Sequence, residues 1–230
     1  MLRRIRIILA TLFFLSVTAL FVDATGMAKE WLGWTAKIQF LPALLALNVV
    51  TVLALVVLTL LVGRAYCSVI CPLGVMQDVI SRISGLRKKK KSRFSYSGEK
   101  KWLRYGILVI FVVALVAGLT PLAALLAPYS SYGRMVSSVV SPSLSPVAIV
   151  AAVSFVVVAI MSWLGGRTYC NTICPVGTIL GFFSRFALFR PVINTSKCNS
   201  CKRCAKKCKA SCIDAKNHRI DYSRCVACMD

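Results

Sequence analysis

The stretch 63–74 reads Gly63-Arg64-Ala65-Tyr66-Cys67-Ser68-Val69-Ile70-Cys71-Pro72-Leu73-Gly74, and it returns at 166–177 as Gly166-Arg167-Thr168-Tyr169-Cys170-Asn171-Thr172-Ile173-Cys174-Pro175-Val176-Gly177. Both copies continue, at the same offset, to a Ser-Arg pair at 81–82 and 184–185. Self-similarity over this length indicates an internal duplication. Each copy follows an apolar run directly, so the chain reads as two repeats that each end in a cysteine turn.

The repeated motif is Gly-Arg-x-Tyr-Cys-x-x-x-Cys-Pro-x-Gly. Cysteines with three residues between them share one face of a helix, the following proline disrupts the preceding helix, and glycine relaxes the turn. The candidate redox or metal-binding thiols are therefore Cys67, Cys71, Cys170 and Cys174. The two pairs could meet and supply four thiolates to an iron–sulfur, zinc or copper(I) centre, or cycle between dithiol and disulfide. Small buried cysteines in a tight membrane turn are the structural alternative.

Composition narrows the class of protein. The 230 residues are 58% hydrophobic and 16% charged, with 29 Lys and Arg against 7 Asp and Glu, for a net charge of +22. Soluble domains carry fewer apolar and more charged residues, and disordered or nucleic-acid-binding chains lack this hydrophobicity. The composition indicates an integral membrane protein and no nucleic-acid partner. The sequence also lacks a P-loop, a Rossmann fingerprint and a c-type haem motif.

Apolar runs predict the fold class. Runs at 7–22, 38–62, 105–127 and 146–164 each approach the roughly 20 residues that cross a bilayer as a helix. We therefore expect an all-α integral membrane protein with four transmembrane helices in two repeats, followed by a small ferredoxin-like cytoplasmic domain. A cleaved signal peptide is the alternative for the first run.

Basic residues predict the orientation. The segment 82–104 holds ten Lys and Arg, the tail from Lys197 holds nine, and the first six residues hold three. Because cytoplasmic loops are enriched in Lys and Arg, both termini and the middle loop are expected in the cytoplasm, with the chain passing several times through a bacterial inner membrane. The run 88–91 then indicates topology or contact with anionic membrane lipid rather than nucleic-acid binding.

The tail beyond Pro191 is polar, basic and rich in cysteine. Its first cysteine run has the spacing of bacterial [4Fe-4S] ferredoxins and consists of Cys198, Cys201, Cys204 and Cys208. A second run begins with Cys225 and Cys228. In the ferredoxin pattern Cys208 joins the second run, so two clusters are expected and each lacks one ligand in the sequence given. We therefore expect a domain that is incomplete at Asp230.

Three features of the tail leave alternatives open. Lys209 stands where proline usually follows the fourth cysteine. Cys212 is an additional cysteine, either a substitute ligand or a packed thiol. Zinc is an alternative for any Cys-x-x-Cys pair, although the spacing fits clusters better.

The expected domains are residues 1–104 and 105–190, each a two-helix repeat with its cysteine turn, and the [4Fe-4S] domain 191–230.

Taken together, the paired Cys67-x-x-x-Cys71-Pro72 and Cys170-x-x-x-Cys174-Pro175 turns and the Cys198 to Cys228 segment resemble the NapH-like membrane polyferredoxins. These are typified by the quinol dehydrogenase membrane subunit of periplasmic nitrate reductase systems. The resemblance implies electron transfer between the quinone pool and a partner redox protein, with this chain as a subunit of a larger oxidoreductase.

The same resemblance also implies an alternative function and suggests candidate residues for contact with quinone. Related members regulate or supply electrons to nitrous oxide reductase, or assist assembly of copper oxidases. The alternative is therefore an assembly or regulatory factor that handles copper or senses redox state through its Cys-x-x-x-Cys-Pro turns. Candidate quinone contacts are Tyr129, Tyr132 and Arg134, in a predicted outer loop, and anchoring at the membrane interface is the other role for these residues.

Overall fold

The computed structural model describes residues 1–23, 26–87, 94–141 and 145–229, and most of them are helical. The basic run 88–91 lies outside the described residues. The helices are α1 (Leu2–Val22), α2 (Met27–Lys37), α3 (Phe40–Leu45), α4 (Val49–Val62), α5 (Ala65–Val69), α6 (Pro72–Arg87), α7 (Lys101–Val116), α8 (Thr120–Leu126), α9 (Pro128–Val140), α10 (Pro146–Gly165), α11 (Thr168–Thr172), α12 (Pro175–Ser184) and α13 (Arg203–Lys207). The tail adds the 3₁₀ turn η1 (Thr195–Lys197) and the short strands β1 (Ile213–Asp214) and β2 (Arg219–Ile220).

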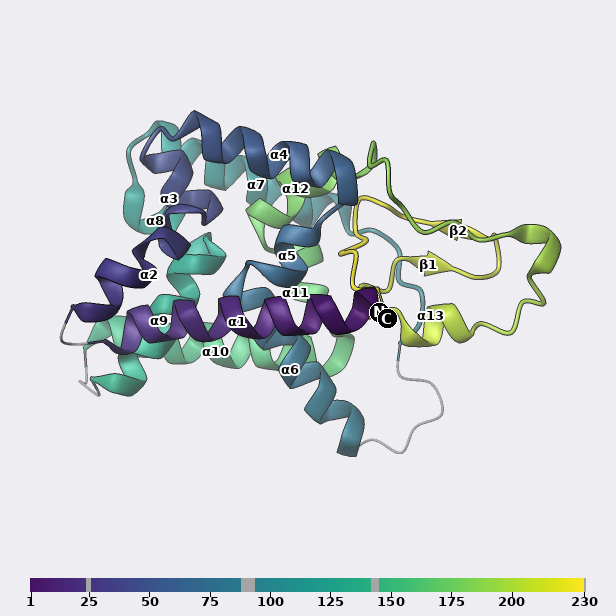
Figure 1. Ribbon diagram of the computed structural model, residues 1–230, viewed down its shortest axis with the longest axis horizontal. Coiled ribbons are helices and arrows are strands. Elements are labelled where there is room, and N and C mark those ends of the chain that lie inside the picture. The colour runs from purple at the N-terminus through teal and green to yellow at the C-terminus, as the bar shows by residue number, and fades with distance from the viewer. Residues whose placement is uncertain (24–25, 88–93, 142–144, 230) are drawn as a thin grey trace.

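The prediction of four transmembrane helices is wrong. Among the described residues, only α1 and α10 are long and apolar enough to cross a membrane. Within their most apolar stretches only 22% and 17% of the residues are buried in the protein, so most of their apolar side chains face outward. Both helices run along the long axis of the molecule in Figure 1.

Two helix ends explain why the other apolar runs are not continuous spans. After α3, Leu47 takes a left-handed conformation, and the amide of Asn48 donates to the carbonyl of Ala43 at 2.9 Å. The side chain of Asn48 then caps α4 by accepting a hydrogen bond from the amide of Thr51. After α7, left-handed Gly118 ends the helix in the same way. These are helix-terminating Schellman motifs, and they divide each apolar run into two short helices.

The repeated motif forms the same structure twice. Gly63 and Gly166 have φ values of 77° and 69°, which end α4 and α10 and turn the chain into the one-turn helices α5 and α11. Proline then opens the next helix in both copies, where its missing N–H needs no partner. The second cysteine of each motif therefore lies at the start of α6 or of α12.

The main hydrophobic core lies where the repeats meet. It combines Val17 of α1, Leu73 of α6, Tyr132 of α9, Val158 of α10 and Leu180 of α12. A smaller core packs α3 against α7 and α8. The cysteine turns thus lie inside the protein, with α5 against α1 and α6, and α11 against α10 and α12.

The tail lies at one end of the molecule, beyond the amino end of α1 (Figure 1). Strands β1 and β2 form a two-stranded antiparallel sheet in which Ile213 pairs with Ile220. Their core contains Cys208, Cys212 and Val226. This small hairpin and the single turn of α13 do not establish the ferredoxin-like domain that we predicted, so that part of the predicted fold class is not confirmed.

Candidate functional site

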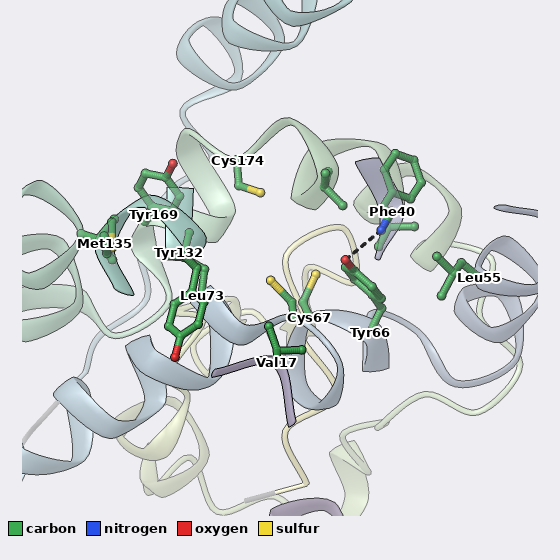
Figure 2. Close-up of a cluster of buried hydrophobic side chains, with 14 residues drawn as sticks. Val17, Phe40, Leu55, Tyr66, Cys67, Leu73, Tyr132, Met135, Tyr169 and Cys174 are labelled. Atoms are coloured by element: carbon green, nitrogen blue, oxygen red, sulfur yellow. Dashed lines mark hydrogen bonds between the residues drawn. The ribbon is translucent and has the colours of Figure 1, made fainter. Parts of the chain in front are cut away.

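The structure places the four motif cysteines together at the interface between the repeats. They are each only 3% exposed. Their sulfur atoms lie close enough for the charge on one thiolate to affect the other three. Figure 2 shows Cys67 and Cys174, one from each repeat, within the same buried cluster. The duplication therefore gives a single buried group of thiols with two from each repeat.

The motif arginines cross between the repeats. Arg64 donates from Nη2 to the carbonyl oxygen of Cys170 at 3.1 Å, and Arg167 donates from Nη1 to the carbonyl oxygen of Cys67. Both guanidinium groups are fully buried. The motif glycines make room for this exchange, because a Cβ atom on Gly74 would collide with the Cys67 carbonyl and lie 2.8 Å from Arg167. Gly177 has the same relation to Cys170 and Arg64.

Arg167 has a carboxylate partner. Asp78 on α6 accepts hydrogen bonds from Arg167 at 2.9 and 2.8 Å, and it also pairs with Arg6 at 3.2 Å and Lys209 at 3.9 Å. Burial alone would raise the pKa of Asp78, but the charge and hydrogen bonds of Arg167 outweigh it and hold that pKa well below its usual range. Asp78 therefore stays ionised and ties α1, α6, the second motif and the tail together.

Arg64 is different, because no carboxylate pairs with it among the described residues. It donates to Asn171 Oδ1 at 2.7 Å and to the Ser223 carbonyl at 3.2 Å, and its Nε has no partner. Its Nη2 lies 3.9 Å from the Cys67 sulfur. A buried cation is costly without a nearby anion. The adjacent groups that can supply the negative charge are the cysteine thiols.

Other donors are aimed at the sulfur atoms. Gln77 Nε2 donates to Cys170 Sγ at 3.2 Å, and the amide of Gly177 donates to Cys174 Sγ at 3.4 Å. Cys174 is the N-cap of α12, where the helix dipole favours negative charge. These two contacts favour the thiolate form, but burial outweighs them and raises the pKa of Cys71, Cys170 and Cys174. The motif cysteines can therefore serve as anionic ligands where a bound metal centre offsets the cost of burying their charge.

The donor set suits an iron–sulfur cluster better than a single metal ion. Across the described ranges, no three His, Cys, Asp or Glu side chains are grouped tightly enough to hold one ion. A four-iron cluster is larger than an ion and takes four cysteine thiolates, which is what the two motifs supply. When bound, such a cluster carries one electron at a time. The cation of Arg64 would balance part of its negative charge.

The tail brings a second group of cysteines together. The sulfur atoms of Cys208 and Cys212 are 3.5 Å apart, Cys212 also hydrogen-bonds to Cys225, and Cys228 packs on the same core. Hydrogen bonding to Cys212 lowers the pKa of both Cys208 and Cys225 below the ordinary value of a thiol. Cys212 is therefore a member of this second group of cysteines, because it contacts both Cys208 and Cys225.

The first cysteines of the tail are placed differently. Cys201 and Cys204 are exposed and Cys198 is half-buried, and none of the three is in the core that holds Cys208. The structure thus gathers the second predicted ligand set together with Cys212. It does not bring the first set, Cys198, Cys201 and Cys204, into that core.

The tail docks directly on the cysteine turns. The amide of Arg167 donates to the Lys209 carbonyl at 2.9 Å, and Asn171 Nδ2 donates to the Ala210 carbonyl at 3.1 Å. On the other side, Arg104 donates to the hydroxyl and the carbonyl of Ser223 at 3.1 and 3.0 Å. These contacts lie within two residues of Cys208 and Cys225. The two groups of cysteines are therefore linked through a few buried residues.

Sequence reasoning missed several residues of this site. Gln77, Asp78 and Arg104 have no counterpart in the repeated motif, because the equivalent positions in the other half carry different residues. Arg64 and Arg167 could be found from the duplication, but their exchange between repeats could not. The predicted outer loop with Tyr129, Tyr132 and Arg134 is the helix α9, and Tyr132 packs against α1.

Comparison with known proteins gives the site its context. Residues 44–93 and 147–195 match a family described as a 4Fe-4S binding domain, and each match contains one cysteine turn. The chain is 24% identical over 228 residues to YccM of Escherichia coli, a protein named for electron transport, covering 91% of this chain and 61% of YccM. The chain is thus a relative of membrane-associated 4Fe-4S electron-transfer proteins. Its cofactors are 4Fe-4S clusters.

Two further proteins are similar to this chain. The uncharacterized protein MJ0749 of Methanocaldococcus jannaschii is 25% identical over 230 residues, which cover 98% of this chain and 82% of that protein. The regulatory protein NosR of Stutzerimonas stutzeri is 28% identical over 176 residues, or 74% of this chain and 23% of NosR. No protein of solved structure matches the chain. These relatives and the two apolar helices indicate membrane association and a redox partner protein.

Proposed function

We propose that this protein passes electrons between the membrane quinone pool and a partner redox protein, as a subunit of a larger oxidoreductase. One observation carries the proposal: four buried cysteines, two from each repeat, lie together, and the buried Arg64 that contacts Cys67 and Cys170 has no carboxylate partner in the described part of the chain. Such a site holds an anionic, thiolate-bound cluster and keeps it away from water. It is suited to a resident electron carrier.

The tail extends this route toward the partner. Its proposed ligands are Cys198, Cys201 and Cys204 for one cluster, and Cys208, Cys225 and Cys228 for the other. The docking contacts of Lys209, Ala210 and Ser223 support the proposal, because they hold the second set against the repeat cysteines. The exposed Cys201 and Cys204 lie where a partner protein can approach.

The membrane arrangement is also a proposal. The amino end of α1, the carboxyl end of α10 and the tail lie at the same end of the molecule (Figure 1). That end carries Arg3, Arg4, Arg6 and the basic tail. The excess of positive charge supports a cytoplasmic location for this end in a bacterial inner membrane. The division into parts 1–104, 105–190 and 191–230 belongs to the same proposal.

A second function has one observation in its favour, because NosR is named a regulatory protein. An assembly or regulatory factor would handle copper or sense redox state through the motif thiols. Burial of all four thiols favours a resident cofactor instead, since delivered copper needs accessible ligands. Copper binding that depends on Cys67 and Cys174, in a protein whose clusters quinol does not reduce, would support the second function.

The direct test uses the full chain purified without oxygen in lipid nanodiscs. We expect EPR signals of reduced clusters to appear after addition of a quinol, at a rate that depends on quinol concentration. Dithionite should give the same final signals, and Cys170→Ser should remove the signal of the repeat cluster. Clusters that dithionite reduces but quinol does not would rule out the quinone pool as the electron source.

A further inference from the structure

A large apolar cavity lies between α1, α9 and α10. Its volume is about 840 Å³, and its walls include Phe14, Thr18, Met76, Tyr132 and Ala152. Ligand sites in proteins have this size and are mostly apolar with a few placed polar groups. Ala152 and the neighbouring α10 side chains are exposed on the outer face of the helix, so the cavity is reached from the side that an embedding lipid would cover.

One hydroxyl pair gives this cavity a polar wall. The hydroxyl of Thr18 donates to the carbonyl of Phe14 at 2.7 Å, and its oxygen lies 2.6 Å from the hydroxyl of Tyr132. Because the Thr18 proton is engaged with Phe14, Tyr132 acts as the donor in this pair. The remaining lone pair of the Tyr132 oxygen is then free to accept a hydrogen bond from a ligand hydroxyl.

The cavity is adjacent to the motif cysteines. Met76 lines it, and the next residue, Gln77, donates to Cys170 Sγ at 3.2 Å. Tyr132 and Met135 line it as well and belong to the same buried cluster as Cys67 and Cys174. In the view of Figure 2, these two side chains lie on one side of the sulfur atoms, and Tyr66 and Phe40 lie on the other.

A second cavity adjoins the first at Ser138. Its volume is about 450 Å³, and its walls contain five serines as well as Tyr129 and Arg134. The apolar cavity thus meets a polar one at the end of α9. A ligand whose apolar part lies in the first cavity can direct a polar group toward the second.

We propose that the 840 Å³ cavity binds the head ring of a lipid-soluble quinol, with Tyr132 accepting a hydrogen bond from a ring hydroxyl. The identity of the ligand class rests on the proposed function. A lipid acyl chain would fit the apolar walls but would use neither the hydroxyl pair nor the polar cavity beyond Ser138. The contact with the cysteine cluster also favours a redox-active ring.

The test is direct labelling of the cluster-loaded full chain in phospholipid nanodiscs with a photoreactive azido-benzoquinol kept reduced without oxygen, followed by peptide mass spectrometry. We expect labelled peptides from α9 and α10 and displacement of the label by a short-chain benzoquinol. Ala152→Trp, which fills the cavity from α10, should lower labelling at least tenfold. Val153→Trp is the matched control, because Val153 is exposed and does not line the cavity.

Tyr132→Phe should weaken quinol binding about three- to tenfold through one lost hydrogen bond.

Two results overturn the inference. One is labelling that Ala152→Trp leaves unchanged, and the other is a label that excess free fatty acid displaces as well as quinol does. The proposed function fails in a different way, through clusters that quinol does not reduce in the wild-type protein. If quinol reduces the clusters but Ala152→Trp leaves the labelling unchanged, this site is rejected and the proposed function stands. If Ala152→Trp lowers the labelling but quinol does not reduce the clusters, the site stands and the proposed function is rejected.

Discussion

Arg64 is the residue whose surroundings say most about the site. It is fully buried, and its Nη2 lies between the Cys67 sulfur and the Cys170 carbonyl. A fixed positive charge at this distance stabilises the more negative, reduced form of a bound cluster.

Arg64→Gln should therefore make the repeat cluster harder to reduce. We expect its reduction potential to fall by about 60 mV, a tenfold change for one electron, in a redox titration followed by EPR. Arg190→Gln is the control, because Arg190 is exposed and lies over the ring of Tyr222. An unchanged potential in Arg64→Gln with a full complement of iron would show that no charged cofactor lies beside Arg64.

The motif glycines give a second prediction at the residue scale. A Cβ atom on Gly74 would meet backbone and a buried guanidinium, neither of which can move away cheaply. Gly74→Ala should lower the free energy of unfolding by about 1–3 kcal/mol, measured by thermal unfolding in detergent. Gly106→Ala, on α7 with open space around it, should be neutral or slightly stabilising. Equal stability of the two variants would contradict the close packing of the repeats.

At the scale of elements, Asp78 joins α6 to α1, to the second cysteine turn and to the tail. Asp78→Asn would leave the fully buried Arg167 without its carboxylate, which should cost about 3–5 kcal/mol of unfolding free energy. The pKa of Asp78 is lowered in the folded protein. Its contribution is therefore complete above its unfolded pKa of about 3.9 and is lost as the pH falls toward the folded value.

Thermal unfolding of wild type and Asp78→Asn across pH checks this sign. We expect a constant gap in Tm between pH 7 and pH 5 and a shrinking gap below about pH 4. A gap that instead widened on acidification would mean that Asp78 is protonated in the folded protein. Glu30→Gln on α2 serves as the control, since Glu30 is exposed.

The helices also show what sequence could and could not predict. The duplication and the prolines of the repeated motif were visible as patterns, whereas Gly118 is a typical helix stop inside the third apolar run that the prediction overlooked. Leu47 carried no such signal, because leucine rarely adopts a left-handed conformation. Apolar periodicity therefore overestimated the length of two helices. The exchange of arginines between repeats depends on tertiary packing, which no local pattern encodes.

In the whole molecule, electron transfer between the two groups of cysteines requires the tail to stay docked on the cysteine turns. Asn171 bridges the two, because it accepts from Arg64 and donates to the Ala210 carbonyl. Asn171→Ala should release part of this contact and speed proteolysis and amide exchange in residues 209–224 severalfold. Asn217→Ala is the control, since Asn217 is exposed and its side chain donates to Asp214 on the far side of the tail hairpin from Asn171. Equal protection of the tail in both variants would show that the two parts do not depend on this contact.

The tail also shows how far spacing can predict a site. The cysteine spacing predicted two ligand sets, and assignment of individual ligands stays a prediction. The position of Cys212 could not be read from spacing, because the hairpin formed by β1 and β2 places it between Cys208 and Cys225. Its place in the fold therefore came from the structure alone.

We expect the two cysteine turns together to hold one 4Fe-4S cluster. Iron and sulfide analysis with EPR, on the full chain purified without oxygen, tests it most directly. Changing both Cys67 and Cys170 to serine should remove about four irons per chain and one EPR signal, while the tail signals remain. Unchanged iron content and unchanged spectra in that variant would contradict the claim.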